Sequence, residues 1–263
     1  MTETRLITHH GPGLFHTMDG PSGSDPLVLL HSLGCDSSLW DAVVPAFSSV
    51  RQVLRYDLRG HGRSEDGAEE CSIEDHVDDL LALLDACDLP RATLVGNSVG
   101  GMIALAAALR VPTRVRHLVL CATGARLGTP DGWSDRMVAI REHGLDAMAD
   151  HVLPRWFVPD FATRRPGLYA GYRARFAGMS VAGYLATCAA LRDADYTRQV
   201  PALRLPTLVL NGEKDLTCPP AAGRELADRI PGACWRSIAD AAHQPPVEQP
   251  MAFNTALSCF LDT

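Results

Sequence analysis

The chain has 263 residues, 46% of them hydrophobic and 21% charged, and a formal net charge of −7 at pH 7. This length predicts one large domain or a core domain with a cap, and the hydrophobic content excludes a disordered chain. The mild acidic balance argues against a nucleic-acid-binding protein, whose binding face is basic. We therefore expect a small-molecule substrate as the partner, and no nucleic acid.

The eight cysteines do not predict a disulfide scaffold, because none of them forms a Cys-x-x-Cys pair and several lie in apolar stretches. The first ten residues lack the hydrophobic segment of a signal peptide. No apolar run approaches the ~20 residues of a membrane span. These features predict a cytoplasmic, soluble protein without a membrane partner, and they are compatible with a homo-oligomer.

Short apolar runs alternate with helical patterns along the chain, which is typical of α/β architecture. Residues 72–87 form the clearest predicted helix, in which Ser72 caps the start and Asp75 takes the acidic position of a capping box. The apolar face of this helix comprises Ile73, Val77, Leu80, Leu81 and Leu84. The predicted buried strands are 27–30, 53–56, 92–95, 117–120 and 207–210.

The alternation stops after Cys121 and resumes at Leu203. We predict a core of residues 1–123 and 201–263, with a helical cap of residues 124–200 over the carboxyl edge of the sheet, where ligands of open α/β sheets bind. The cap holds 10 of the 24 basic and 8 of the 31 acidic residues, a net charge of about +2, against −9 for the core. Either these arginines are a solvated surface, or some face inward and grip an anionic substrate.

Gly96-Asn97-Ser98-Val99-Gly100 is a G-x-S-x-G segment between a predicted strand and a predicted helix. This strand–turn–helix context is that of a nucleophile elbow, in which glycines permit a strained turn and the serine hydroxyl is exposed at the sheet edge. Ser98 is therefore the predicted nucleophile.

A serine hydroxyl needs a base, which follows it in the chain order of an elbow enzyme. His243 follows the last apolar run and is the predicted base. Asp215 ends a strand that runs into a turn, and it is the predicted acid that orients the histidine. Asp193 and Asp195 are the alternatives for the acid. The other histidines after Ser98 lie in a predicted strand or in the cap: His117, His143 and His151.

The tetrahedral intermediate requires an oxyanion hole. One donor is expected from the backbone N–H of Val99, which follows the nucleophile, and the other from the loop after the strand 27–30. We expect the backbone N–H of Leu33 to be the donor from that loop. His31 lies upstream of the elbow, and we expect it to shape the loop rather than to act as the base.

With these residues in place, the chain resembles an α/β-hydrolase over essentially its whole length. The matching segments are 56–64, 211–215 with Pro219, and Ala242-His243 with Glu248 and Pro250. The resemblance implies a mostly parallel eight-stranded sheet flanked by helices, with the helical cap inserted after the sixth strand.

Within that superfamily the chain is most similar to 3-oxoadipate enol-lactonases. The similar segments are 31–36 with 39–40, 120–128 with Trp133, 152–157 and 183–188. The resemblance implies hydrolysis of a carboxylated enol-lactone in aromatic degradation through a Ser98 acyl-enzyme, with no metal and no organic cofactor. Two stretches depart from that family: Val99 replaces the Met or Leu common after the nucleophile, and Gln244-Pro245-Pro246 follows the histidine.

Two pairs of cap residues are candidates for binding the substrate carboxylate. Arg136 lies one helical turn after Trp133, and Arg155 precedes Trp156. The alternative is that the tryptophans pack in the core and the arginines face solvent.

Other functions remain open on this sequence. A broader carboxylesterase or a cofactor-free perhydrolase uses the same triad, and a non-catalytic ligand receptor uses the same fold. A carbon–carbon bond hydrolase is less expected because the oxyanion and histidine segments differ from those that such enzymes usually carry. Ser98 disfavours the enzymes of this fold that use a nucleophilic aspartate.

Overall fold

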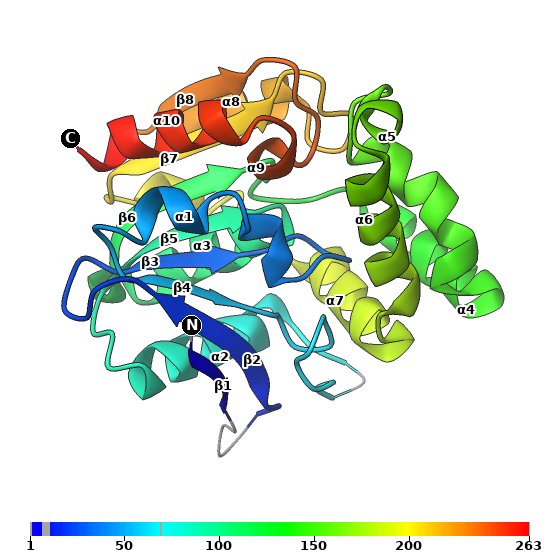
Figure 1. Ribbon diagram of the computed structural model, residues 1–263, viewed down its shortest axis with the longest axis horizontal. Helices are drawn as coiled ribbons and strands as arrows, with labels where there is room; N and C mark the ends of the chain where they lie inside the picture. Colours follow the sequence, from blue (N-terminus) through cyan, green and yellow to red (C-terminus); the bar gives the residue numbers. More distant parts are fainter. Residues whose placement is uncertain (1, 7–10, 69, 263) are drawn as a thin grey trace.

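A computed structural model describes residues 2–6, 11–68 and 70–262 (Figure 1). Part of the N-terminal segment that bears on the signal-peptide prediction, Met1 and residues 7–10, lies outside the described residues. The strands are β1 Thr2–Leu6, β2 Leu14–Asp19, β3 Leu27–Leu30, β4 Val53–Tyr56, β5 Ala92–Asn97, β6 Val115–Cys121, β7 Thr207–Gly212 and β8 Cys234–Ile238. All five strands named from the sequence are present, and β1, β2 and β8 are additional.

The eight strands form one sheet in the order β1-β2-β4-β3-β5-β6-β7-β8. β1 and β2 are antiparallel to their neighbours, and the six strands from β4 to β8 in this order are parallel. The parallel strands β3, β5 and β7 are buried along their whole length. Their continuous apolar runs reflect helices on both faces, and the mostly parallel eight-stranded sheet is confirmed.

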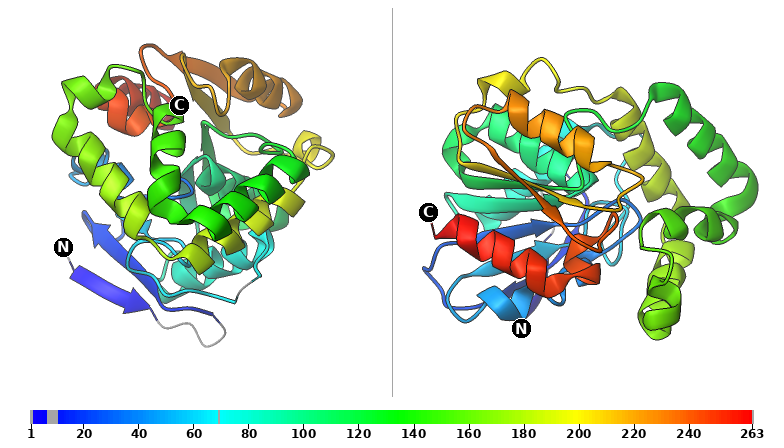
Figure 2. Two further views of the ribbon diagram at one scale, coloured as in Figure 1. Left: turned by 90° about the vertical axis from the view of Figure 1, so that its right-hand side faces the viewer. Right: turned by 90° about the horizontal axis from the view of Figure 1, so that it is seen from above.

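Ten α-helices accompany the sheet in the described residues. They are α1 Val44–Phe47, α2 Ile73–Ala86, α3 Val99–Arg110, α4 Pro130–Val152, α5 Phe161–Arg164, α6 Pro166–Gly178, α7 Val181–Asp193, α8 Pro220–Arg229, α9 Pro245–Glu248 and α10 Pro250–Leu261. Short 3-10 helices are Ser37–Trp40, Pro112–Arg114, Leu153–Arg155 and Val200–Ala202. α1 and α10 lie on one face of the sheet, and α2, α3 and α8 lie on the other (Figure 2).

Helix α2 illustrates how the local sequence sets an element. Ser72 and Asp75 form the expected reciprocal capping box, and the helix ends at Ala86. Its buried face includes Ile73, Val77, Leu80 and Leu84, but Leu81 is only half-buried and Leu83 is buried instead. The buried face of α2 therefore differs from the predicted one in containing Leu83 in place of Leu81.

The helices α4–α7 connect β6 to β7 and stand together beyond one end of the sheet (Figures 1 and 2). α4 packs against both α6 and α7, and it is broken at Gly144, where φ is 76°. This helical layer lies where the sequence predicts a cap. Among the described residues no single helix has the length and apolarity to cross a membrane, and α6 and α7 meet that test only as a pair bent by 90°.

Candidate active site

Ser98 sits at a sharp turn between β5 and α3. Its backbone has φ 56° and ψ −119°, a left-handed conformation that is strained for a residue with a side chain. The two flanking glycines are required by close packing: a Cβ on Gly96 would lie 2.2 Å from the Gly100 carbonyl oxygen, and one on Gly100 would lie 2.3 Å from the Leu30 carbonyl oxygen. The turn therefore has the geometry of a nucleophile elbow.

A backbone and a side-chain hydrogen bond from the end of β6 and the residues after it hold this turn in place. Ser98 N–H donates to the Cys121 carbonyl oxygen at 2.8 Å, and the Ser98 carbonyl oxygen accepts from Thr123 Oγ1 at 2.7 Å. Ser98 is 8% exposed and immediately precedes the first turn of α3, whose N-terminal end carries partial positive charge. That field favours negative charge developing beside the serine.

His243 and Asp215 form a buried hydrogen-bonded pair. His243 Nδ1 lies 2.9 Å from Asp215 Oδ2, and both side chains are almost completely shielded from solvent. The other carboxylate oxygen, Asp215 Oδ1, accepts from the backbone N–H groups of Thr217 at 2.7 Å and Cys218 at 2.9 Å. Since Asp215 accepts from Nδ1–H, the tautomer assigned by this bond leaves Nε2 as the proton acceptor.

Two further contacts fix the loop that carries His243. Its backbone N–H donates to the Trp156 carbonyl oxygen at 3.0 Å. The buried Glu248 carboxylate accepts from the backbone N–H groups on both sides of His243 and from Val158 N–H at 2.8 Å. Burial raises the Glu248 pKa and these N–H donors oppose the shift. One carboxylate thus joins the histidine loop to the segment between α4 and α5 that contains Val158.

The residues expected to form the oxyanion hole lie at the same sheet edge. Val99 is the first residue of α3, where a backbone N–H has no partner within the helix. Leu33 is buried in the loop after β3. His31 shapes this loop: its Nδ1 lies 2.8 Å from the Ser32 carbonyl oxygen, and its Nε2 accepts from Leu58 N–H at 2.9 Å. Burial lowers the His31 pKa, consistent with a neutral ring that holds backbone.

Ser98 opens into a pocket of about 320 Å³ beneath the helical layer. Three of the four predicted substrate-binding residues, Trp133, Arg136 and Arg155, line it together with Thr217 and Cys218. The Arg136 guanidinium carbon lies 5.3 Å from the Trp133 ring centroid, as expected for residues one turn apart.

Trp156 is not among the residues that line this pocket. Its side chain is 6% exposed and packs edge-on against Phe157 and Phe176. Its closest link to the site is the backbone bond that it accepts from His243. The alternative acids also face elsewhere, since Asp193 pairs with Arg192, and Asp195 with Arg126.

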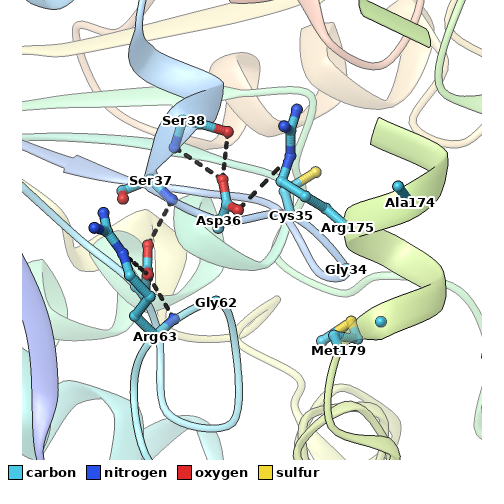
Figure 3. A pocket seen from close by; sticks show the side chains of 12 residues that line it. Gly34, Cys35, Asp36, Ser37, Ser38, Gly62, Arg63, Ala174, Arg175 and Met179 are labelled. Atoms are coloured by element: carbon cyan, nitrogen blue, oxygen red, sulfur yellow. Dashed lines mark hydrogen bonds and ion pairs between the residues drawn. The ribbon is translucent and has the colours of Figure 1, made fainter. Parts of the chain in front are cut away.

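A second cavity, of about 520 Å³, lies between α6 and the loop after β3 (Figure 3). Each of its two arginines faces a carboxylate in its own wall: Arg175 Nε lies 3.7 Å from Asp36 Oδ2, and Arg63 Nε lies 3.9 Å from Asp57 Oδ2. Ser98 does not line this cavity. The larger cavity is therefore not the candidate active site; the pocket that contains Ser98 is.

The cysteine that lines the Ser98 pocket does not compete with Ser98 as a nucleophile. Cys218 lines the Ser98 pocket, but burial, and then the charge of Asp215, raises the pKa of its thiol well above the ordinary value. A neutral thiol is a poor nucleophile. Among the described residues, no group of three or more His, Cys, Asp or Glu side chains is placed to hold a metal ion.

Comparison with known proteins identifies the family. The model of the alpha/beta hydrolase fold family matches residues 25–250. The chain belongs to this α/β-hydrolase family. Among its curated relatives, this hydrolase is 31% identical to 3-oxoadipate enol-lactonase 2 of Acinetobacter baylyi over 255 residues, which cover 97% of this chain and 95% of the relative.

Solved structures agree with this relationship. The enol-lactonase from Burkholderia xenovorans LB400 superposes on this α/β-hydrolase with a TM-score of 0.95, at 38% identity and covering 99% of this chain and all of that one. A thermophilic esterase from Thermogutta terrifontis gives a TM-score of 0.92 at 28% identity, covering 100% of this chain and 98% of that one. Close similarity thus extends to hydrolases of more than one substrate class.

Glu248 belongs to a family pattern in the sequence, but its three backbone donors are visible only in the structure. In the sequence, Asn97 is only a variable position of the G-x-S-x-G segment, and Gln244 is only part of the unusual stretch after the histidine. Both side chains are fully buried and directly bonded, at 3.0 Å from Asn97 Nδ2 to Gln244 Oε1. The sequence signal for both is a polar residue next to Ser98 and another next to His243.

Proposed function

We propose that this α/β-hydrolase cleaves a small carboxylated lactone or ester through a Ser98 acyl-enzyme, and that its substrate is an enol-lactone of the 3-oxoadipate type. The observation that carries the proposal is the buried Asp215–His243 pair at the sheet edge where Ser98 opens into an arginine-lined pocket. The enol-lactonase relatives support the substrate class.

The proposed reaction has two halves. Ser98 Oγ attacks the lactone carbonyl carbon while His243 Nε2 takes the hydroxyl proton, and Asp215 stabilises the imidazolium. The backbone N–H groups of Leu33 and Val99 hold the oxyanion. The carbon–oxygen bond of the ring then breaks, and the enolate leaves, takes the proton held by the His243 imidazolium and tautomerises to the ketone. The neutral His243 then deprotonates a water that attacks the acyl carbon, the bond to Ser98 Oγ breaks, and His243 returns the proton to Ser98 Oγ as the second carboxylate is released.

Residues 124–200 are the proposed cap, and Arg136 and Arg155 are the proposed partners of the substrate carboxylate. Both line the Ser98 pocket, whereas the whole chain is acidic. Arg136 also donates to Tyr184 Oη at 3.4 Å, a long bond that leaves other guanidinium donors for a ligand. A planar guanidinium fits a carboxylate in a bidentate manner.

A substrate panel with Ser98→Ala tests the reaction. The parent enzyme is expected to turn over the enol-lactone with a higher kcat/KM than neutral p-nitrophenyl esters, and Ser98→Ala is expected to lose turnover on both. Higher kcat/KM on the neutral esters would replace the lactonase by a broader carboxylesterase. Parent-like hydrolysis by folded Ser98→Ala would refute the mechanism.

A matched pair of arginine variants tests the carboxylate site. Arg136→Gln is expected to lower kcat/KM for the carboxylated substrate by about 10- to 100-fold, since hydrogen bonds to charged groups contribute about 1.5–3 kcal/mol. It should leave neutral esters nearly unchanged. Arg141→Gln, on the same helix but exposed and outside the pocket, is the control. Equal effects of the two variants would contradict the assignment of Arg136.

A further inference from the structure

Three buried polar side chains from distant parts of the chain are hydrogen-bonded to one another. Asn97 Nδ2 lies 2.6 Å from Ser32 Oγ and 3.0 Å from Gln244 Oε1, and Ser32 Oγ donates to Gln244 Oε1 at 3.2 Å. None of the three is more than 1% exposed. Asn97 Nδ2 also donates to the His243 carbonyl oxygen at 3.1 Å. We call Ser32, Asn97 and Gln244 the polar brace.

Each member of the polar brace is the chain neighbour of a group that the proposed mechanism uses. Ser32 precedes Leu33 in the oxyanion loop, Asn97 precedes Ser98, and Gln244 follows His243. The hydrogen bonds therefore connect three backbone segments, 65 to 212 positions apart in the chain, whose relative placement sets the reacting geometry.

The hydrogen bonding of the polar brace is incomplete. Asn97 Oδ1 is shielded from solvent and has no hydrogen-bond partner among the described residues. Within the described part of the chain, Gln244 Nε2 donates to the Cys35 sulfur, at 3.8 Å, and sulfur is a weak acceptor. A buried acceptor without a partner weakens the folded state, and such groups in native structures call for an explanation. Apolar residues of similar volume would satisfy packing alone at less cost.

We propose that Ser32, Asn97 and Gln244 are positioning residues that hold the oxyanion loop and the histidine loop in register with Ser98. This inference rests on the proposed function and deepens it. The brace touches neither substrate nor reacting atoms, so its effect is on the placement of Leu33 N–H and His243. Arg136 and Arg155 line the Ser98 pocket and the three brace residues do not, so ground-state binding through these arginines should not depend on the brace.

The expected signature is a loss in kcat without a matching rise in KM. Displacement of a catalytic group by about 1 Å can cost about 10²-fold in rate, and loss of one oxyanion donor costs about 10²–10³-fold. Ser32→Ala and Gln244→Met each remove the Ser32–Gln244 bond with little change in volume. We expect each to lower kcat by about 10- to 100-fold and to change KM by less than about threefold.

A double-mutant cycle distinguishes a shared brace from separate contributions. If Ser32 and Gln244 act through one linkage, the combined variant should lose little more than the worse single variant. A loss equal to the product of the two single losses would overturn the proposal. Thr207→Val is the control, because it removes a buried hydroxyl bond to the Leu205 carbonyl oxygen at the opposite edge of the sheet. It should leave kcat unchanged.

A boronic acid that forms a tetrahedral adduct with Ser98 provides the second readout. Its affinity should fall in Ser32→Ala by the same factor as kcat/KM, while competitive binding of the carboxylate product stays constant. If Ser32 only stabilised the fold, Ser32→Ala would lower the melting temperature but leave the boronate affinity and kcat/KM per active site unchanged. Titration with a phosphonate that labels Ser98 counts the active sites, so partial misfolding does not enter the rates.

The outcomes separate this inference from the proposed function. If Ser98→Ala is inactive but Ser32→Ala and Gln244→Met keep kcat within twofold, the polar brace is refuted and the hydrolase mechanism stands. If Ser98→Ala retains activity, both the hydrolase mechanism and the polar brace are refuted. Where Gln244→Met does not fold, the boronate affinity of Ser32→Ala still decides: an unchanged affinity overturns the proposal and a matched loss supports it.

Discussion

Two fully buried histidines should make the stability of this protein depend on pH. Burial first, and then the neighbouring His31, lowers the pKa of His61 to about 3. Burial first, and then the charge of Arg59, lowers the pKa of His76 to about 3. His61 Nε2 and His76 Nδ1 are shielded from solvent and have no hydrogen-bond partner among the described residues. Both rings are therefore neutral when folded.

The sign follows from proton binding. Between the unfolded pKa of 6.5 and the folded value of about 3, the unfolded chain binds more protons than the folded one. Stability is therefore complete above pH 6.5 and falls as the pH drops through this window. At pH 5, about 1.5 pH units below the unfolded pKa, each histidine costs about 2 kcal/mol and the two together about 4 kcal/mol.

Urea unfolding at pH 7.5, 6.5 and 5, followed by tryptophan fluorescence, measures this loss. His76→Gln removes one titrating ring, so the difference in unfolding free energy between pH 7.5 and pH 5 should shrink by about 2 kcal/mol relative to the parent. The pH-dependent difference is the readout, because the substitution also changes stability at every pH. If His61→Gln and His76→Gln both keep the parental pH dependence, the argument for neutral buried rings is wrong.

Three further substitutions probe the site and the turn beneath it. Gly100→Ala should lower the unfolding free energy by about 3 kcal/mol or more, because the added Cβ would collide with backbone atoms. Gly167→Ala is the control: its Cβ would have no heavy atom within 4 Å, so the unfolding free energy should change by less than about 1 kcal/mol. Urea unfolding midpoints measure both variants, and equal effects would contradict the packing argument. Asp215→Asn should lower kcat by about 10⁴-fold in a steady-state assay, because the histidine tautomer is no longer held, and a loss below tenfold would exclude Asp215 as the orienting acid. Glu248→Gln should lower the unfolding free energy by about 1–3 kcal/mol in thermal unfolding, because an amide presents only one oxygen to the three N–H groups that donate to the carboxylate; unchanged stability would contradict a structural role for Glu248.

Local sequence identified the elements that build the site. The apolar run before Gly96 and the helix-forming run after Gly100 predicted the turn at Ser98, since glycine is needed where side chains would collide with backbone. The strand run ending near Asp215 and the loop position of His243 placed both at the carboxyl edge of a parallel sheet. These inferences succeed because periodicity and turn chemistry are short-range properties.

Buried polar groups were not predictable in the same way. His76 and Asp79 lie on the buried face of α2, where Asp79 accepts from the Arg59 side chain at 2.6 and 2.8 Å. From sequence alone, a polar residue on a helix is predicted to be exposed unless a buried partner is known. Here the partner of Asp79 is Arg59, which lies outside α2. The pockets show the same limit. Arg136 lines the Ser98 cavity and Arg175 lines the other one, although both belong to the same predicted helical segment and nothing in the sequence assigns them to different cavities.

The sequence by itself determined the fold family, the strand–turn–helix at Ser98 and the order of serine, acid and histidine along the chain. Only the tertiary structure decided which carboxylate meets His243, which arginines share a cavity with Ser98, and that Ser32, Asn97 and Gln244 connect three distant backbone segments. The physical reason is that helices, strands and turns depend on neighbours within a few residues. A hydrogen bond spanning 147 positions, such as that from Asn97 to Gln244, depends on how the whole sheet assembles.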